Sequence, residues 1–252
     1  MKLLINQIMS EQTSQQVLEA DYTFSLFLLI NLALISALIL TVITLILVAL
    51  TRLATHYRRK EVSLRLQPQH RDYPILAFFH PQCDGGAGGE KVLYQAIQAI
   101  QQSPHRDLQI VIYSGSTKSP GEILTHVHER FGLSIMPINL HFIRLRSQGK
   151  SLRPDNYPSF TMFWQAWASV RVCFEAMVTC PCDVFVDTMG VGYAYPVVKM
   201  FFGPKIYSYT HYPLVSYDMM RDVVNGVQQF NNREEITASK LKTVFLLWLG
   251  SH

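Results

Sequence analysis

The order of apolar and polar positions separates an apolar N-terminal segment from an alternating remainder. No charged residue occurs from Tyr22 to Thr51, and residues 24–50 are almost all Leu, Ile, Val, Ala, Phe and Thr. About 20 such residues suffice for a helix to cross a bilayer. A signal peptide has a basic start and a shorter apolar core, whereas Glu11, Glu19 and Asp21 precede this segment. The pattern therefore predicts a transmembrane helix over residues 22–51.

The charged residues on either side of this segment predict its orientation. The only basic residue before it is Lys2, while five follow it closely: Arg52, Arg58, Arg59, Lys60 and Arg65. Basic residues accumulate on the cytoplasmic side of spanning helices. We therefore expect residues 1–21 to form a lumenal tail, residues 52–72 a basic juxtamembrane linker at the anionic lipid surface, and the main body to lie in the cytosol.

From residue 74 onward, short apolar runs alternate with helical stretches. The run 74–79 is typical of a strand buried on both faces, and we predict further strands over 108–113, 139–145, 183–187 and 205–210. Helices are predicted over 90–102, 119–132, 159–178 and 197–202, with start signals at Ser119-Pro120 and a stop signal at Gly132. The alternation predicts an α/β domain with a doubly wound parallel sheet over 73–230.

The pattern weakens toward the C-terminus. A further helix is expected over 219–227 within the domain. Residues 231–252 end in a basic and then apolar stretch that is too short to span a bilayer. We expect either an interfacial helix there or a helix that lacks its packing partner.

Composition supports this division and excludes some functions. Hydrophobic residues make up 49% of the 252 residues and charged residues 16%, below the roughly 25% charge of soluble domains. The net charge of +4 is too small and too scattered for a nucleic-acid surface. The four cysteines include Cys180-Pro181-Cys182, which lacks zinc-site spacing. We expect reduced thiols in a cytosolic domain.

Ligands of doubly wound sheets bind beyond the carboxyl ends of the strands, where a glycine-rich loop is expected. Gly85, Gly86, Gly88 and Gly89 follow the first strand and precede a helix that begins at Glu90. Glycine lets backbone amides approach a phosphate, and a helix N-terminus favours its charge. The spacing differs from GxGxxG, and no GK[ST] follows, so a tight structural turn is the alternative. For Glu90, a helix cap is favoured over a ligand contact.

Two further candidates end later strands. Asp187 closes the fourth strand and either binds a ligand hydroxyl or caps the next segment. His211 closes the fifth strand and is placed to contact a sugar hydroxyl or a phosphate, or to carry a proton. A purely structural role is the alternative for His211.

Two other features favour structural interpretations. The basic stretch Arg144, Arg146, Lys150 and Arg153 is typical of a solvated face, with anionic lipid or a lipid pyrophosphate as the alternative ligand. The aromatic helix, which carries Phe160, Phe163, Trp164, Trp167 and Phe174, is expected in the core, with membrane contact as the lesser option.

Several motifs in order resemble a known enzyme family. They are the stretch from His80 to Tyr94, Tyr113-Ser-Gly115, Tyr157-Pro-Ser-Phe-Thr161, the stretch from Asp183 to Gly190, and Ser208-Tyr-Thr-His-Tyr-Pro213. Together they are similar to the GDP-mannose-dependent α-1,2-mannosyltransferases of asparagine-linked glycosylation in the endoplasmic reticulum. Two departures stand in the glycine loop: Asp84 replaces the usual Asn, and Ala87 interrupts the glycines. A methyl group at Ala87 requires a negative φ.

The resemblance implies the GT-B fold, in which two Rossmann-like domains enclose the active site. It implies a retaining transferase that needs no metal or other cofactor and moves mannose from GDP-mannose to a dolichyl-pyrophosphate-linked oligosaccharide. The glycine loop and Glu90 would face the donor phosphates and acceptor, His211 the transferred mannose, and Asp187 the cleft. Implied partners are these two substrates, the bilayer and other mannosyltransferases of the pathway, but no nucleic acid.

The resemblance covers only the first of the two GT-B domains. The nucleotide-binding domain, with its pair of glutamates eight residues apart, has no counterpart after Asn225. We therefore expect the chain alone to be inactive, as a single-pass endoplasmic reticulum membrane protein with its catalytic domain in the cytosol. The alternative function is a non-catalytic membrane-anchoring subunit of a split GT-B glycosyltransferase. An unrelated nucleotide-binding protein is disfavoured because Asp107 precedes the second strand instead of ending it.

Overall fold

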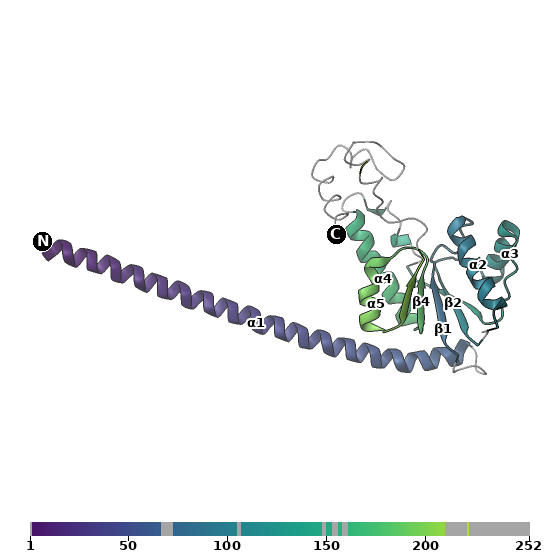
Figure 1. Ribbon diagram of the computed structural model, residues 1–252, viewed down its shortest axis with the longest axis horizontal. Coiled ribbons are helices and arrows are strands. Elements are labelled where there is room, and N and C mark those ends of the chain that lie inside the picture. Colours follow the sequence, from purple (N-terminus) through teal and green to yellow (C-terminus); the bar gives the residue numbers. More distant parts are fainter. Residues whose placement is uncertain are drawn as a thin grey trace.

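The computed structural model describes residues 2–66, 73–104, 107–147, 150–152, 156–157, 161–209 and 221. An α/β domain is attached to one long helix (Figure 1). The elements in chain order are α1 (Lys2–Leu66), β1 (Ile75–Phe79), α2 (Gly88–Gln102), β2 (Gln109–Ser114), α3 (Pro120–Phe131), β3 (Leu140–Arg144), η2 (Lys150–Leu152), α4 (Thr161–Thr179), β4 (Val184–Asp187), η4 (Gly192–Ala194), α5 (Tyr195–Phe201) and β5 (Lys205–Ser208).

The five strands form one parallel sheet in the order β3-β2-β1-β4-β5. The predicted parallel α/β sheet is therefore confirmed. The strand order reverses beside β1, because β2 and β3 extend to one side of it and β4 and β5 to the other. The carboxyl ends of β1 and β4 flank this switch point, which is the place where open α/β sheets bind ligands.

Helices cover both faces of the sheet (Figure 1). Successive residues of a strand point to opposite faces, so Ala77 and Phe79 of β1 enter the core beneath α4 and α5, and Phe78 enters the core beneath α2 and α3. Both faces of β1 are thus buried, as its unbroken apolar run predicts, whereas the edge strand β5 is largely exposed.

The start and stop signals of α3 are confirmed. The Ser119 side chain accepts a hydrogen bond from the Glu122 N–H (3.3 Å), and a Glu122 carboxylate oxygen accepts one from the Ser119 N–H (2.7 Å). Gly132 ends the helix in the left-handed conformation, with φ of 67°, and its N–H donates to the His128 carbonyl (2.8 Å). Glycine is the residue that adopts this conformation most easily.

The long helix α1 continues beyond the predicted transmembrane segment. The segment expected to be a linker is helical as far as Leu66, because its last turns pack on the domain: Val62 and Leu66 contact the core beneath α4 and α5, and Ser63 is buried. Its apolar part remains exposed. Within the described residues, this is the one helix long and apolar enough to cross a membrane, judged by length and composition.

The aromatic side chains of α4 do not lie in the core, which corrects the sequence expectation. Phe163, Trp164 and Trp167 are exposed, and Phe174 is partly so. The other side of α4 packs on the sheet through Val172, Cys173, Ala176 and Met177. Because α4 is apolar on all sides, its pattern does not reveal which side faces inward.

Several expectations concern residues that lie outside the described ones. They include Phe160 and Arg153, the expected helix over 219–227 apart from residue 221, and the C-terminal segment 231–252.

Candidate functional site

The glycine loop joins β1 to α2 at the switch point, and the structure explains why two of its residues are glycine. The Gly85 N–H donates to the Gln82 carbonyl (3.1 Å), and a Cβ atom at Gly85 would lie 2.7 Å from Oε1 of Glu90. Gly86 has φ of 76°, a conformation that side chains disfavour. The interpretation as a tight turn therefore accounts for Gly85 and Gly86.

Gly88 is different, because neither packing nor conformation requires a glycine there. A Cβ atom at Gly88 would meet no atom within 4 Å. Gly88 opens α2 and follows Ala87, whose φ of −94° is negative, so the methyl group that interrupts the glycines is tolerated. What remains to explain Gly88 is close approach by a ligand, which stays a prediction.

The start of α2 lacks a side-chain cap of the usual kind. Alanine carries no side-chain acceptor, so Ala87 cannot cap the amides of the first turn. Only the reverse contact forms: Oε2 of Glu90 accepts a hydrogen bond from the Ala87 N–H (2.9 Å). The capping role of Glu90 is thereby confirmed. The amides of Gly88 and Gly89 precede the first helical hydrogen bond, Lys91 N–H to Ala87 carbonyl (3.3 Å), and such amides bind anions.

His80 is a residue of this site that the sequence did not single out. It is 2% exposed, and its Nδ1 lies 2.7 Å from Oγ1 of Thr188, which donates to the Phe79 carbonyl (3.2 Å). With the Thr188 proton used in this way, His80 Nδ1 is the donor, and Nε2 lies 3.7 Å from Oε1 of Glu90. His80 thus links the ends of β1 and β4. A histidine followed by proline directly after a buried strand is the signal that could have found it.

Burial raises the pKa of the Glu90 carboxyl, but hydrogen bonds and charge from His80, together with backbone amides, outweigh it and leave the pKa below its ordinary value. Glu90 is therefore ionised at neutral pH. A negative charge inside the first turn weakens anion binding there.

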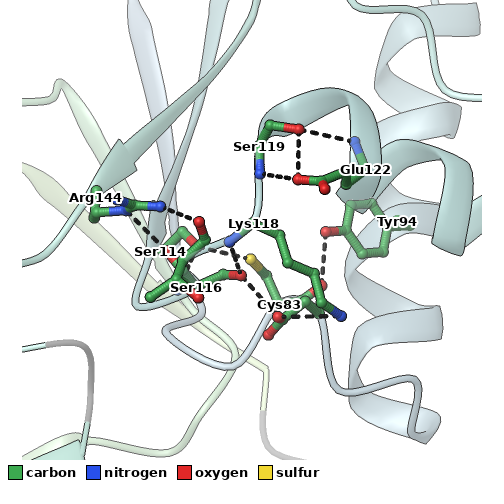
Figure 2. Close-up of polar contacts among 10 residues, drawn as sticks. Cys83, Tyr94, Ser114, Ser116, Lys118, Ser119, Glu122 and Arg144 are labelled. Atoms are coloured by element: carbon green, nitrogen blue, oxygen red, sulfur yellow. Dashed lines mark hydrogen bonds and ion pairs between the residues drawn. The ribbon is translucent and has the colours of Figure 1, made fainter.

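The loops after β1 and β2 are held together by polar contacts (Figure 2). Ser116 Oγ donates to Asp84 Oδ2 (2.7 Å), and Lys118 Nζ lies 3.5 Å from the same oxygen. The Tyr94 hydroxyl donates to the Cys83 carbonyl (2.8 Å). Arg144 donates to the carbonyls of Ser116 (2.9 Å from Nε) and Thr117. This part of the basic stretch, expected on a solvated face, is therefore used to shape a loop.

The four cysteines form no disulfide in this geometry. All four are free and buried, as expected for reduced thiols. Burial raises the pKa of the Cys83 thiol to about 11, so it is protonated at neutral pH and a poor nucleophile. The described residues contain no group of three His, Cys, Asp or Glu side chains able to hold a metal ion.

Asp187 is fully buried, and its carboxylate is occupied by the chain itself. Oδ1 accepts hydrogen bonds from the N–H groups of Met189 (2.8 Å) and Gly190 (3.2 Å), and Oδ2 accepts from Val191 (2.6 Å) and from the Tyr195 hydroxyl. The capping interpretation accounts for all these contacts, because they close the turn that leads into η4 and α5. A catalytic role for Asp187 stays a prediction.

His211 lies outside the described residues. The chain is last described before it at Tyr209, whose N–H donates to the Asp187 carbonyl (2.8 Å). The segment that leads to His211 therefore starts beside β4. The structure brings together the glycine loop, His80 and the turn after Asp187 at one edge of the sheet.

Residues 73–248 match the family model described as ALG11 mannosyltransferase N-terminus. The chain belongs to this family. The matched region includes the α/β domain with the parallel sheet and the glycine loop at its switch point. No solved structure gives a significant match.

Three curated relatives share the name GDP-Man:Man(3)GlcNAc(2)-PP-Dol alpha-1,2-mannosyltransferase. The protein from Dictyostelium discoideum is 35% identical over 169 residues, which cover 67% of this chain and 33% of the relative. Those from Mus musculus and Homo sapiens are 34% and 33% identical, covering 74% and 75% of this chain and 37% and 39% of the relatives. The ALG11-type chain therefore spans between a third and two fifths of the length of these relatives.

Proposed function

We propose that this chain forms the N-terminal half of a GDP-mannose-dependent α-1,2-mannosyltransferase that extends a dolichyl-pyrophosphate-linked oligosaccharide. Its membership of the ALG11 N-terminal family carries the proposal. The names of the relatives contain the donor, the acceptor and the linkage. The position of the glycine loop at the switch point supports it, because phosphates bind there in doubly wound sheets.

In the proposed reaction, the bond between the anomeric carbon and the donor diphosphate breaks, an acceptor hydroxyl oxygen bonds to that carbon with retention, and the hydroxyl proton passes to the diphosphate oxygen of the departing GDP. Negative charge grows on the diphosphate as the bond breaks. The amides of Gly88 and Gly89 at the start of α2 supply hydrogen bonds and a favourable dipole for that charge. The absence of a capping side chain at Ala87 leaves these amides to a ligand. The proposal requires no metal ion.

The proposal gives His211 and Asp187 different roles. His211 contacts the transferred mannose. Asp187 acts through backbone geometry, since its carboxylate shapes the turn after β4 and its carbonyl accepts from Tyr209, two residues before His211. Asp187 is then a positioning residue, and a second Rossmann-like domain of the GT-B fold binds the nucleotide.

We further propose that α1 spans the endoplasmic reticulum membrane once over residues 22–51 and holds the domain on the cytosolic side. The exposed apolar surface of this part of α1 supports a lipid environment. The basic residues that follow it favour the cytoplasmic side. A membrane-held enzyme meets a lipid-linked acceptor in two dimensions, which suits the proposed substrate.

A transfer assay tests the proposal. The chain, purified in detergent, is given GDP-mannose and a dolichyl-pyrophosphate trimannosyl acceptor, with and without the separately purified C-terminal part of the Homo sapiens relative. We expect transfer only when both parts are present, and its loss in His211→Ala. Transfer by the chain alone would contradict the need for a second domain. Equally fast transfer from other nucleotide sugars would contradict the proposal that GDP-mannose is the specific donor.

A further inference from the structure

The outward side of α4 forms an apolar surface without an acidic residue. Its exposed side chains Phe163, Trp164, Trp167, Phe174 and Val178 fall within an arc of about 100° at 3.6 residues per turn. We call these five residues the outer α4 face. Arg171 lies within the same arc and is exposed. The one acid of α4, Glu175, is half-buried and accepts a hydrogen bond from the Arg146 N–H.

The outer α4 face is connected to the end of the apolar part of α1. Arg52, the first charged residue after that part, donates from Nε to the Met200 carbonyl (3.0 Å) and from Nη2 to the Lys199 carbonyl (3.2 Å). These carbonyls belong to the last turn of α5. The Phe174 ring packs edge-on against Phe201 and Phe202, with centroids 6.2 and 5.0 Å apart. A series of contacts therefore leads from the end of the apolar run to α4.

The arrangement of the layers places this surface on the side of the apolar helix. In Figure 1, the N-terminal part of α1 extends away from the domain on the side of α4 and α5, whereas α2 and α3 lie on the opposite side. A bilayer crossed by residues 22–51 would therefore face α4 and α5 and not α2 and α3.

The chemistry of the surface fits the boundary between lipid headgroups and acyl chains. Tryptophan and phenylalanine settle there, and an arginine among them reaches the phosphates. A contiguous exposed patch of apolar side chains marks a contact surface, whereas singly exposed apolar residues do not. We propose that the outer α4 face is a second membrane contact, inserted into the headgroup region of the bilayer that α1 spans. This inference rests on the proposed span of α1 and goes beyond it, because two attachments fix the tilt of the domain.

Two of the three tryptophans of the chain, Trp164 and Trp167, lie on this face, and the third is Trp248. The full chain is placed in phosphatidylcholine–phosphatidylserine vesicles with or without bromine atoms on the acyl chains. The variants Trp167→Phe/Trp248→Phe and Trp164→Phe/Trp248→Phe each leave one reporter on α4. The control carries Glu129→Trp on α3 and all three tryptophans replaced by phenylalanine. Glu129 is exposed on the opposite side of the domain.

We expect brominated lipid to reduce the emission of both α4 reporters roughly twofold, since interfacial helices insert about 5–10 Å, and to leave the α3 reporter unchanged. Equal quenching at all sites, or none at α4, overturns the inference. Blue-shifted α4 emission without quenching also overturns it, because a protein segment then covers the face. Extraction with alkaline carbonate distinguishes the proposed span of α1 from the proposed membrane contact of the outer α4 face. If the chain stays in the vesicles but its α4 reporters are not quenched, the span is supported and the second contact is contradicted.

Discussion

Nη2 of Arg59 lies 2.6 Å from Oδ2 of Asp183, and this ion pair joins the long helix to the sheet. The same carboxylate oxygen accepts from the Ile75 N–H (2.7 Å), and Arg59 Nη2 also donates to the Tyr73 carbonyl (2.9 Å). One carboxylate therefore joins α1 to the beginnings of β1 and β4. Through this contact, α1 is attached directly to β1, the strand that leads into the glycine loop.

Replacing Arg59 by lysine should loosen this joint. Lysine cannot reproduce the planar fork, and because the pair is partly exposed, we expect a loss of only about 1 kcal/mol in the free energy of unfolding. Hydrogen exchange should rise over residues 59–66. Arg65→Lys is the matched control, because Arg65 pairs with Glu61 on the exposed side of α1. Equal effects of the two variants would contradict a special role for Arg59.

Gly88→Ala separates ligand approach from folding. A methyl group fits at Gly88 in the free structure, so stability should be unchanged or slightly higher. If a phosphate approaches this amide, transfer in the two-part assay should fall by roughly tenfold or more. The comparison variant Gly86→Ala should instead cost about 1–2 kcal/mol, because its φ is positive. Unchanged transfer by a stable Gly88→Ala protein would remove the loop from the phosphate site.

Ala87→Ser tests the uncapped start of α2. The extended backbone at Ala87 suits an N-cap residue, so a serine should bond the first-turn amides and raise stability by about 1 kcal/mol. It should also raise the KM for GDP-mannose, because the hydroxyl competes with the donor phosphate. Ser119→Ala, which removes the cap of α3, should lower stability by a similar amount and leave KM alone. Urea unfolding and transfer kinetics measure both quantities.

Asp187→Asn should destabilise the domain strongly. One carboxylate oxygen becomes an NH₂ group that faces N–H donors, and bonds to a charged acceptor are worth about 1.5–3 kcal/mol each. Tyr195→Phe removes one donor to the same carboxylate and should cost about 1 kcal/mol. Chemical denaturation measures both losses. A stable Asp187→Asn protein that has lost transfer activity would instead support a direct catalytic role.

The lowered pKa of Glu90 predicts a pH effect on stability. A carboxyl whose folded pKa lies below its unfolded value of about 4.5 stabilises the fold above that pH and loses this contribution as pH falls through the folded value. Glu90→Gln should therefore be less stable than the native chain at pH 7, and the difference should shrink below pH 4.5. Urea titrations at the two ends of this range test it. A constant difference would mean that the Glu90 charge contributes nothing.

The central strands β1 and β2 were predictable because they are buried on both faces, whereas the edge strand β5 is largely exposed. The run that begins at residue 74 is short, unbroken and apolar, as in the buried strands of parallel sheets, and β1 confirms the prediction. The caps of α3 were predictable because Ser119, Glu122 and Gly132 act locally. The ion pair of Arg59 with Asp183 was not, because its partners are separated by 124 positions and local patterns carry no information about such pairs.

The candidate site was only partly predictable. The glycine loop is a local motif, and its place at the switch point follows from the alternation of strands and helices. The His-Pro pair after the first strand could have drawn attention to His80, but its role depends on Thr188 and Glu90, which only the fold brings beside it. The exposure of Trp164 and Trp167 was missed because α4 carries apolar residues on all of its sides. Only packing decides which side faces the sheet.

The unbroken course of α1 into the domain has a geometric consequence. A helix couples length to rotation, at about 100° and 1.5 Å per residue. One residue inserted between Thr51 and Arg59 would therefore turn everything after it by about 100° around the helix axis, while moving it along the axis by only about the length of one carbon–carbon bond. In a chain anchored through residues 22–51, the number of residues between the anchor and the domain therefore fixes the direction in which the glycine loop points around the helix axis.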